Sequence, residues 1–98
     1  MQTPSVLAGG AAPKLVATKV VALYEPTSGR IHHLHTSHFY EGAVQPAEST
    51  LIAHAARQAR RLGHDTERLS NTISENPLHG QIPHRIDTDS GAFVPLTD

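Results

Sequence analysis

The segment 14–25, KLVATKVVALYE, constrains the fold most because an extended chain with this sequence is apolar on both sides. Alternation places Leu15, Ala17, Val21 and Leu23 on one face, and Val16, Val20, Ala22 and Tyr24 on the other. Only Thr18 and Lys19 interrupt the pattern. A strand of this kind is usually central in its sheet, or covered by a helix on one face and by a partner on the other.

The four residues after this segment, Pro-Thr-Ser-Gly at 26–29, predict a tight turn into a second strand over 30–40. Proline restricts φ early in a turn, and glycine accepts the left-handed exit. Glu25 and Arg30 are then expected to form an ion pair across the hairpin. The acid-x-x-Ser-Gly pattern recurs at 87–91, before Phe93. We interpret the two copies as one generic turn used twice, in preference to an internal duplication.

A helix is predicted between Pro46 and Gly63. Proline suits the first helical turn, an acid such as Glu48 suits the positive helix end, and glycine suits the position after the helix. The expected buried stripe has three- and four-residue spacing and consists of Leu51, Ile52, Ala55, Ala56, Ala59 and Leu62. The residues expected to face outward are His54, Arg57, Gln58 and Arg61.

The rest of the chain predicts a third strand over 69–74, a loop over 75–84 and a second hairpin over 85–94. This order indicates an α+β fold, with one helix packed on a small, mostly antiparallel sheet whose other face is open to a partner. Residues 14–98 are expected to form a single domain. Residues 1–13 contain two prolines and a Gly-Gly pair, and we expect a flexible tail with no secretory signal.

Composition excludes several classes of protein. The 98 residues contain no cysteine, which excludes disulfide scaffolds, thiolate metal sites and cysteine nucleophiles. The net charge of −1 argues against nucleic-acid binding and against a polybasic membrane module. No run approaches the ~20 apolar residues of a membrane-spanning helix. We therefore expect a cytoplasmic protein that binds neither nucleic acid nor membrane.

The eight histidines are the unusual feature, since they equal all Lys and Arg residues in number. His33 and His35 are two apart on a predicted strand and share a face, where they could hold one divalent transition metal such as zinc. A third ligand could come from the other histidines or carboxylates: His54, His64, His79, His84, Glu41 or Asp87. We favour the alternative that these are structural histidines on a sheet face, with no cofactor. A pH-sensitive interface is a further alternative.

No nucleophile elbow and no phosphate-binding glycine loop occurs, so an enzymatic function is uncertain and a non-catalytic one is favoured. At 38% hydrophobic residues, many of them alanine, a chain this short builds a thin core, which favours a homo-oligomer. The sequence thus predicts a small protein- or peptide-binding accessory module. Its expected partner-binding residues are Val16, Val20, Tyr24, Phe39 and Tyr40. The alternative is a metal-dependent protein or small enzyme built on His33 and His35.

Overall fold

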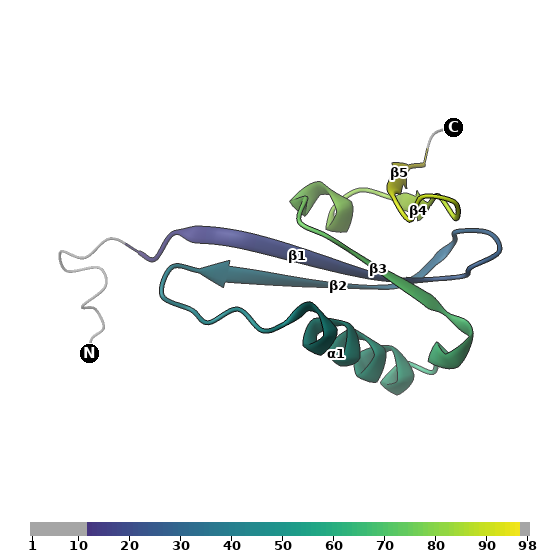
Figure 1. Cartoon of the computed structure of the whole chain (residues 1–98), viewed down its shortest axis with the longest axis horizontal. Coiled ribbons are helices and arrows are strands. Elements are labelled where there is room, and N and C mark those ends of the chain that lie inside the picture. The colour runs from purple at the N-terminus through teal and green to yellow at the C-terminus, as the bar shows by residue number, and fades with distance from the viewer. Residues whose placement is uncertain (1–11, 97–98) are drawn as a thin grey trace.

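A computed structural model describes residues 12–96, which form three layers stacked around one central strand (Figure 1). In chain order the elements are β1 (Leu15–Tyr24), β2 (Ile31–Tyr40), α1 (Glu48–Arg61), the 3₁₀ helix η1 (Thr66–Arg68), β3 (Ser70–Ser74), the 3₁₀ helix η2 (Pro77–Gly80), β4 (His84–Ile86) and β5 (Phe93–Pro95). The predicted α+β class is confirmed. Most of the predicted tail, residues 1–11, lies outside the described residues.

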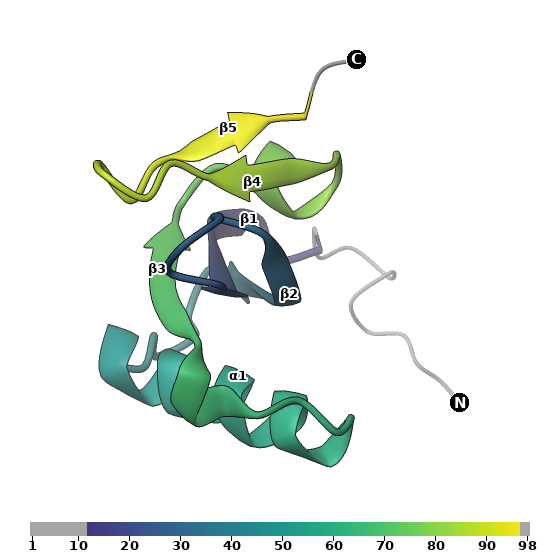
Figure 2. The ribbon, with the colours of Figure 1, turned by 90° about the vertical axis from the view of Figure 1, so that its right-hand side faces the viewer.

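Strand β1 lies at the centre of a three-stranded antiparallel sheet with the order β2-β1-β3. Strand β2 pairs with almost the full length of β1, whereas β3 pairs only with its second half, Val20–Tyr24. The β1–β2 ribbon therefore extends past the end of β3 (Figure 1). Strands β4 and β5 form a separate antiparallel pair. Figure 2 shows α1 on one side of the central sheet and the β4–β5 hairpin on the other.

The layer between α1 and the sheet contains the larger apolar cluster. Val21 and Leu23 point toward α1 and pack against Leu51, Ala55 and Ala59, all of which are buried. Because Ala55 and Ala59 are small, the buried face of α1 can approach the sheet closely. Leu62 was expected in the same stripe, but this prediction is wrong, since Leu62 is the residue that caps the helix and is 69% exposed.

The opposite face of β1 is also buried, and the chain itself covers it. Val20, Ala22 and Ile86 of β4 have no exposed surface. Ile86 donates a backbone hydrogen bond to the carbonyl of Gly29 at 2.8 Å, which joins β4 to the first hairpin turn. The expectation that this face is open to a partner is therefore wrong over the second half of β1, because a later hairpin folds back onto it.

Both predicted turns form, with closely similar geometry. Gly29 and Gly91 have φ values of 80° and 76°, and their N–H groups donate to Glu25 and Asp87 at 2.8 and 2.7 Å. The expected Glu25–Arg30 ion pair is not found among residues 12–96. Instead the Glu25 carboxylate accepts from Ser28 at 2.7 Å and lies 2.6 Å from Nε2 of His32.

We expect Gly29→Ala to destabilise the fold far more than Gly42→Ala. Both glycines have positive φ, which costs a non-glycine residue about 1–2 kcal/mol. A Cβ at Gly29 would also lie 1.9 Å from the Ile86 carbonyl oxygen, whereas one at Gly42 would meet nothing within 4 Å. Moving β4 away should add about 2 kcal/mol through the lost hydrogen bond and packing. Urea unfolding measures both, and equal losses would contradict this role for Gly29.

Candidate functional site

Four histidines line the boundary between β2 and the helical side of the molecule. His33 and His35 project from the face of β2 that faces α1, opposite Leu23 and Val21 in the strand register. The ring of His35 lies 5.2 Å from that of His54 on α1, and the ring of His33 lies 6.2 Å from that of His64, between centroids. We call these four residues the histidine seam.

The seam favours neutral imidazoles. Partial burial lowers the pKa of His33 and of His35 below the ordinary value, and the charges of the neighbouring His64 and His54 lower it further. The Nε2 atom of His33 is buried without a hydrogen-bond partner, so this ring carries an unsatisfied polar atom. A protonated ring would therefore lie among other potential cations, away from much of the solvent.

The structure brings the predicted metal ligands only partly together. Of the possible third ligands, His54 and His64 lie on the same side of the sheet as His33 and His35, but each approaches a different one of them. Within residues 12–96, no three His, Asp or Glu side chains converge closely enough to hold a metal ion. The seam in this conformation consists of the His35–His54 pair and of His64, whose ring lies 6.2 Å from that of His33 and 5.9 Å from that of His32.

Of the other candidate ligands, His79 and His84 lie elsewhere and have packing partners of their own. Asp87 accepts backbone hydrogen bonds within the β4–β5 turn, and Glu41 is exposed just after β2. The ring of His79 stacks on Phe93 at 4.4 Å with an interplanar angle of 12°, and His84 meets His79 edge-on at 4.9 Å. His79 also hydrogen-bonds to Ser74 at 2.6 Å. This aromatic cluster attaches η2 and the β4–β5 hairpin to the end of β3. Sequence reasoning missed it because its members are unrelated by any local spacing.

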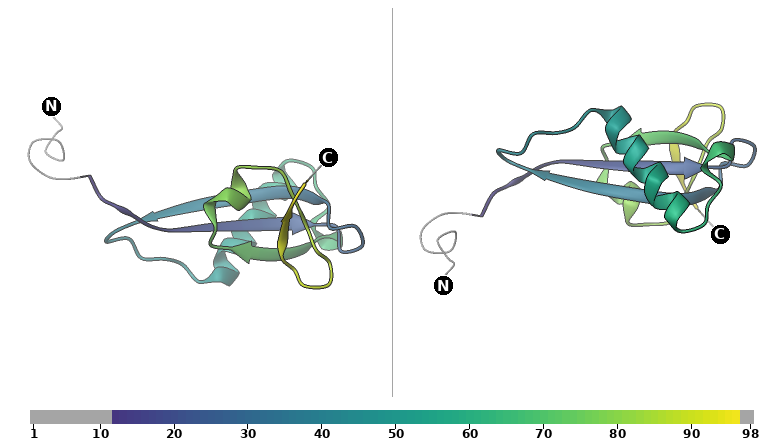
Figure 3. Two further views of the ribbon diagram at one scale, coloured as in Figure 1. Left: turned by 90° about the horizontal axis from the view of Figure 1, so that it is seen from above. Right: turned by 90° about the horizontal axis from the view of Figure 1, so that it is seen from below.

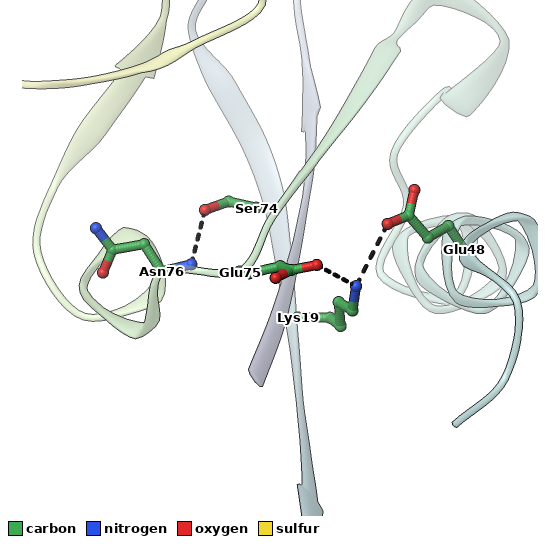
Figure 4. Close-up of polar contacts among 5 residues, drawn as sticks. All are labelled: Lys19, Glu48, Ser74, Glu75 and Asn76. Atoms are coloured by element: carbon green, nitrogen blue, oxygen red, sulfur yellow. Dashed lines mark hydrogen bonds and ion pairs between the residues drawn. The ribbon is translucent and has the colours of Figure 1, made fainter. Parts of the chain in front are cut away.

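Lys19 joins three elements at the point where β1 leaves the core (Figure 4). Its Nζ lies 2.6 Å from Glu75, just after β3, and 3.4 Å from Glu48, the first residue of α1. The hydrogen bond that Lys19 donates to Glu75 raises the pKa of Lys19, and burial opposes this effect. Sequence reasoning treated Lys19 only as an interruption of an apolar pattern, because both partners are distant in the chain.

The predicted partner-binding residues do not form one surface. Val16 and Tyr40 are 55% and 48% exposed, and the neighbouring Leu15, which pairs with Tyr40, is 50% exposed. We call these three residues the ribbon end. Val20 is fully buried, with Gly80 of η2 beside its side chain, and cannot contact a partner. Phe39 packs against the α1 core, and Tyr24 is half-buried at the far end of β1.

A shallow groove follows the ribbon end along the edge of β1 that β3 leaves unpaired. It has a volume of about 250 Å³ and is lined by Leu15, Val16, Ala17, Thr18, Glu75 and Pro77. Strand β3 stops at Ser74, and the chain then turns into η2, which begins at Pro77. The groove therefore continues the line of β3, beside a strand whose backbone has no pairing partner on that side among residues 12–96.

A larger hollow, bordered by charged residues, lies at the opposite end of the sheet, beside the first hairpin turn. It has a volume of about 540 Å³ and is lined by Glu25, Pro26, Thr27, His32, Asp65, Arg68 and Leu69. Hydrogen bonds from Ser28 and His32 lower the pKa of Glu25. Charges of both signs surround this hollow, and no single class of ligand fits it better than another.

Comparisons with known proteins give no match for this chain among protein-family models, curated proteins or solved structures. Within residues 12–96, no helix combines the length and the apolar character needed to cross a bilayer.

The histidine seam predicts that stability falls on acidification. Because folding lowers the pKa of His33 and His35 below about 6.5, their unfolded forms bind protons first, so stability is full above pH 6.5 and declines as the pH falls below it. The lowered pKa values of Glu25 and Glu75 act only below about pH 4.5, the ordinary range for glutamate. Urea unfolding at pH 7.5 and pH 5.5 measures the difference.

The double variant His33→Gln/His35→Gln should reduce this loss of stability in acid. Some pH dependence of stability should persist in the double variant, because burial also lowers the pKa of His79. His38→Gln is the matched control, since His38 lies on the same strand but outside the seam, beside Thr18. An unchanged pH dependence in the double variant would show that the seam does not cause it.

Proposed function

We propose that this chain is a non-catalytic protein- or peptide-binding module, with a tendency to form homo-oligomers, that takes its ligand at the ribbon end. The observation that carries the proposal is the extension of the β1–β2 ribbon past β3. This extension leaves three large apolar side chains half-exposed beside an unpaired strand edge. Contiguous apolar surface of this kind commonly marks an interaction site.

The groove favours a ligand in extended conformation. A peptide that pairs with Leu15–Lys19 would continue the line of β3 and add a strand to the sheet, and main-chain hydrogen bonds would supply much of its affinity. Apolar ligand side chains on one face would meet Leu15 and Tyr40. Glu75 borders the groove, so an acidic residue at the adjoining ligand position should be disfavoured.

A transition-metal-dependent function at the histidine seam is the second candidate. The observation that favours it is the buried, unpartnered Nε2 of His33 facing a second imidazole. Neutral imidazole is a good ligand for zinc, copper and nickel, and the lowered pKa values keep His33 and His35 neutral near pH 7. Small movements of α1 and of the segment at His64 would be needed to bring a third ring to the same ion.

Peptides selected from a random display library should be extended and apolar, and NMR should place their effect on the amides of Leu15–Lys19. The variant Leu15→Lys/Val16→Lys should bind a selected peptide at least about tenfold more weakly, a loss of about 1.4 kcal/mol. Leu62→Lys is the control, because Leu62 is at least as exposed as Leu15 and Val16 but lies at the end of α1. Selected peptides that perturb amides elsewhere, or that bind the double variant normally, would contradict the proposal.

For the second candidate, elemental analysis of untagged protein should find close to one equivalent of zinc, copper or nickel. That metal should be lost from His33→Ala/His35→Ala and retained in His79→Ala. If the protein retains no metal after dialysis against a trace of the free ion, the result contradicts a metal-dependent function. The binding module is then the only candidate.

A further inference from the structure

We infer that the outer edge of β2 pairs antiparallel with β2 of a second copy of this chain, which forms a symmetric dimer with one continuous sheet. This inference rests on the proposed function and specifies how its homo-oligomer forms. It uses a surface separate from the ribbon-end groove, because β2 and the groove lie on opposite sides of β1. The two surfaces can therefore be tested independently.

Strand β2 is the long free edge of the sheet. It spans ten residues, and its outer side has no pairing strand within residues 12–96. The other edge is arranged differently. Strand β3 has five residues, and Thr72 donates a side-chain hydrogen bond to the carbonyl of Gly91 at 3.1 Å, so the β4–β5 turn lies against that edge. Free edges normally carry features that prevent pairing with other chains.

Strand β2 lacks those protective features. Its sequence, IHHLHTSHFY, contains no Lys, Arg, Asp, Glu or Pro, and with neutral histidines it carries no formal charge. The two irregularities in its pairing with β1 lie toward the ends, between Leu15 and Ala17 and between Leu23 and Tyr24, so the middle of the strand is regular. A second extended chain can therefore approach along most of its length without meeting like charges or a bulge.

The charges that flank β2 indicate which second chain fits. Exposed Arg30 directly precedes the strand, and exposed Glu41 directly follows it. When two copies of β2 run antiparallel and overlap fully, each end of the paired region brings Arg30 of one copy beside Glu41 of the other. Parallel pairing would instead place like charges together. The charges at the two ends of β2 are thus complementary to those of a second β2 strand only when the two strands run antiparallel. This self-complementarity points to a second copy of this chain.

The requirement that paired residues share a sheet face restricts the register. With both α1 helices on the same side, full overlap is centred on His35 or on Thr36, so that residues of equal parity face each other. The irregularity between Leu23 and Tyr24 gives β2 one extra residue at His32, so Arg30 lies opposite Phe39 in the first register and opposite Glu41 in the second. The register centred on Thr36 therefore pairs the two opposite charges directly.

Charge reversal tests the inference at pH 7.5, about one pH unit above the ordinary pKa of histidine. Sedimentation equilibrium should give a dimer of twice the 10.5 kDa chain mass. Arg30→Glu and Glu41→Arg should each weaken dimerisation at least about tenfold, because two attractive pairs per dimer become repulsive. The double variant Arg30→Glu/Glu41→Arg should restore dimerisation to near the wild-type level. Asp89→Arg, in the β4–β5 turn near the opposite edge, is the control for net charge and should have no effect.

A second variant tests the edge itself. Leu34→Lys/Thr36→Lys places lysines at the exposed centre of β2 and should give a monomer whose circular dichroism matches that of the wild type. A monomeric wild type overturns the inference, as does a dimer that survives this variant or fails to recover in the charge-swapped double variant. Peptide binding at the ribbon end is measured separately on the Leu34→Lys/Thr36→Lys variant. Its loss in Leu15→Lys/Val16→Lys supports the proposed function even if the β2 dimer is absent.

Discussion

The burial of β1 on both faces is the constraint on which the rest of the structure depends. Four consecutive residues, Val20–Leu23, are each at most 4% exposed. Because side chains alternate along a strand, this burial requires one layer of structure on each side of the sheet. Helix α1 supplies one layer, and the β4–β5 hairpin supplies the other (Figure 3). Burial of one large aliphatic side chain contributes roughly 1.5–3 kcal/mol, so these few residues supply a large share of the stability of a small core.

The same arrangement explains why β1 has two different halves. Its second half has a strand on each side and a layer on each face, whereas its first half has β2 alone. Lys19 marks the boundary, where its ammonium group holds the first residue of α1 and the residue after β3. An apolar residue in place of Lys19 could not hold the carboxylates of Glu48 and Glu75 near each other. The ribbon end is thus a consequence of where the covering layers stop.

Local patterns in the sequence predicted the elements well and their partners poorly. Alternation predicted β1, the stripe from Leu51 to Ala59 predicted α1, and the acid-x-x-Ser-Gly pattern predicted both hairpin turns. Alternation also showed that β1 needs cover on both faces. It could not show whether that cover comes from the same chain or another, and Val20 was therefore assigned to a partner surface although η2 lies against its side chain. The histidine pairs were equally out of reach, because His35 meets His54 only after α1 crosses the sheet.

Histidine also suits β2 because it links the properties of the histidine seam to those of the free outer edge of this strand. An edge strand made only of apolar residues would aggregate, whereas one carrying Lys or Glu would repel a second strand. Neutral imidazole is polar enough to face water and still leaves the edge without formal charge. On the α1 side, His33 and His35 lie against other imidazoles in an environment that disfavours their protonated forms. The packing that holds α1 on the sheet therefore also disfavours positive charge on His33 and His35, in the part of β2 where two such strands would pair.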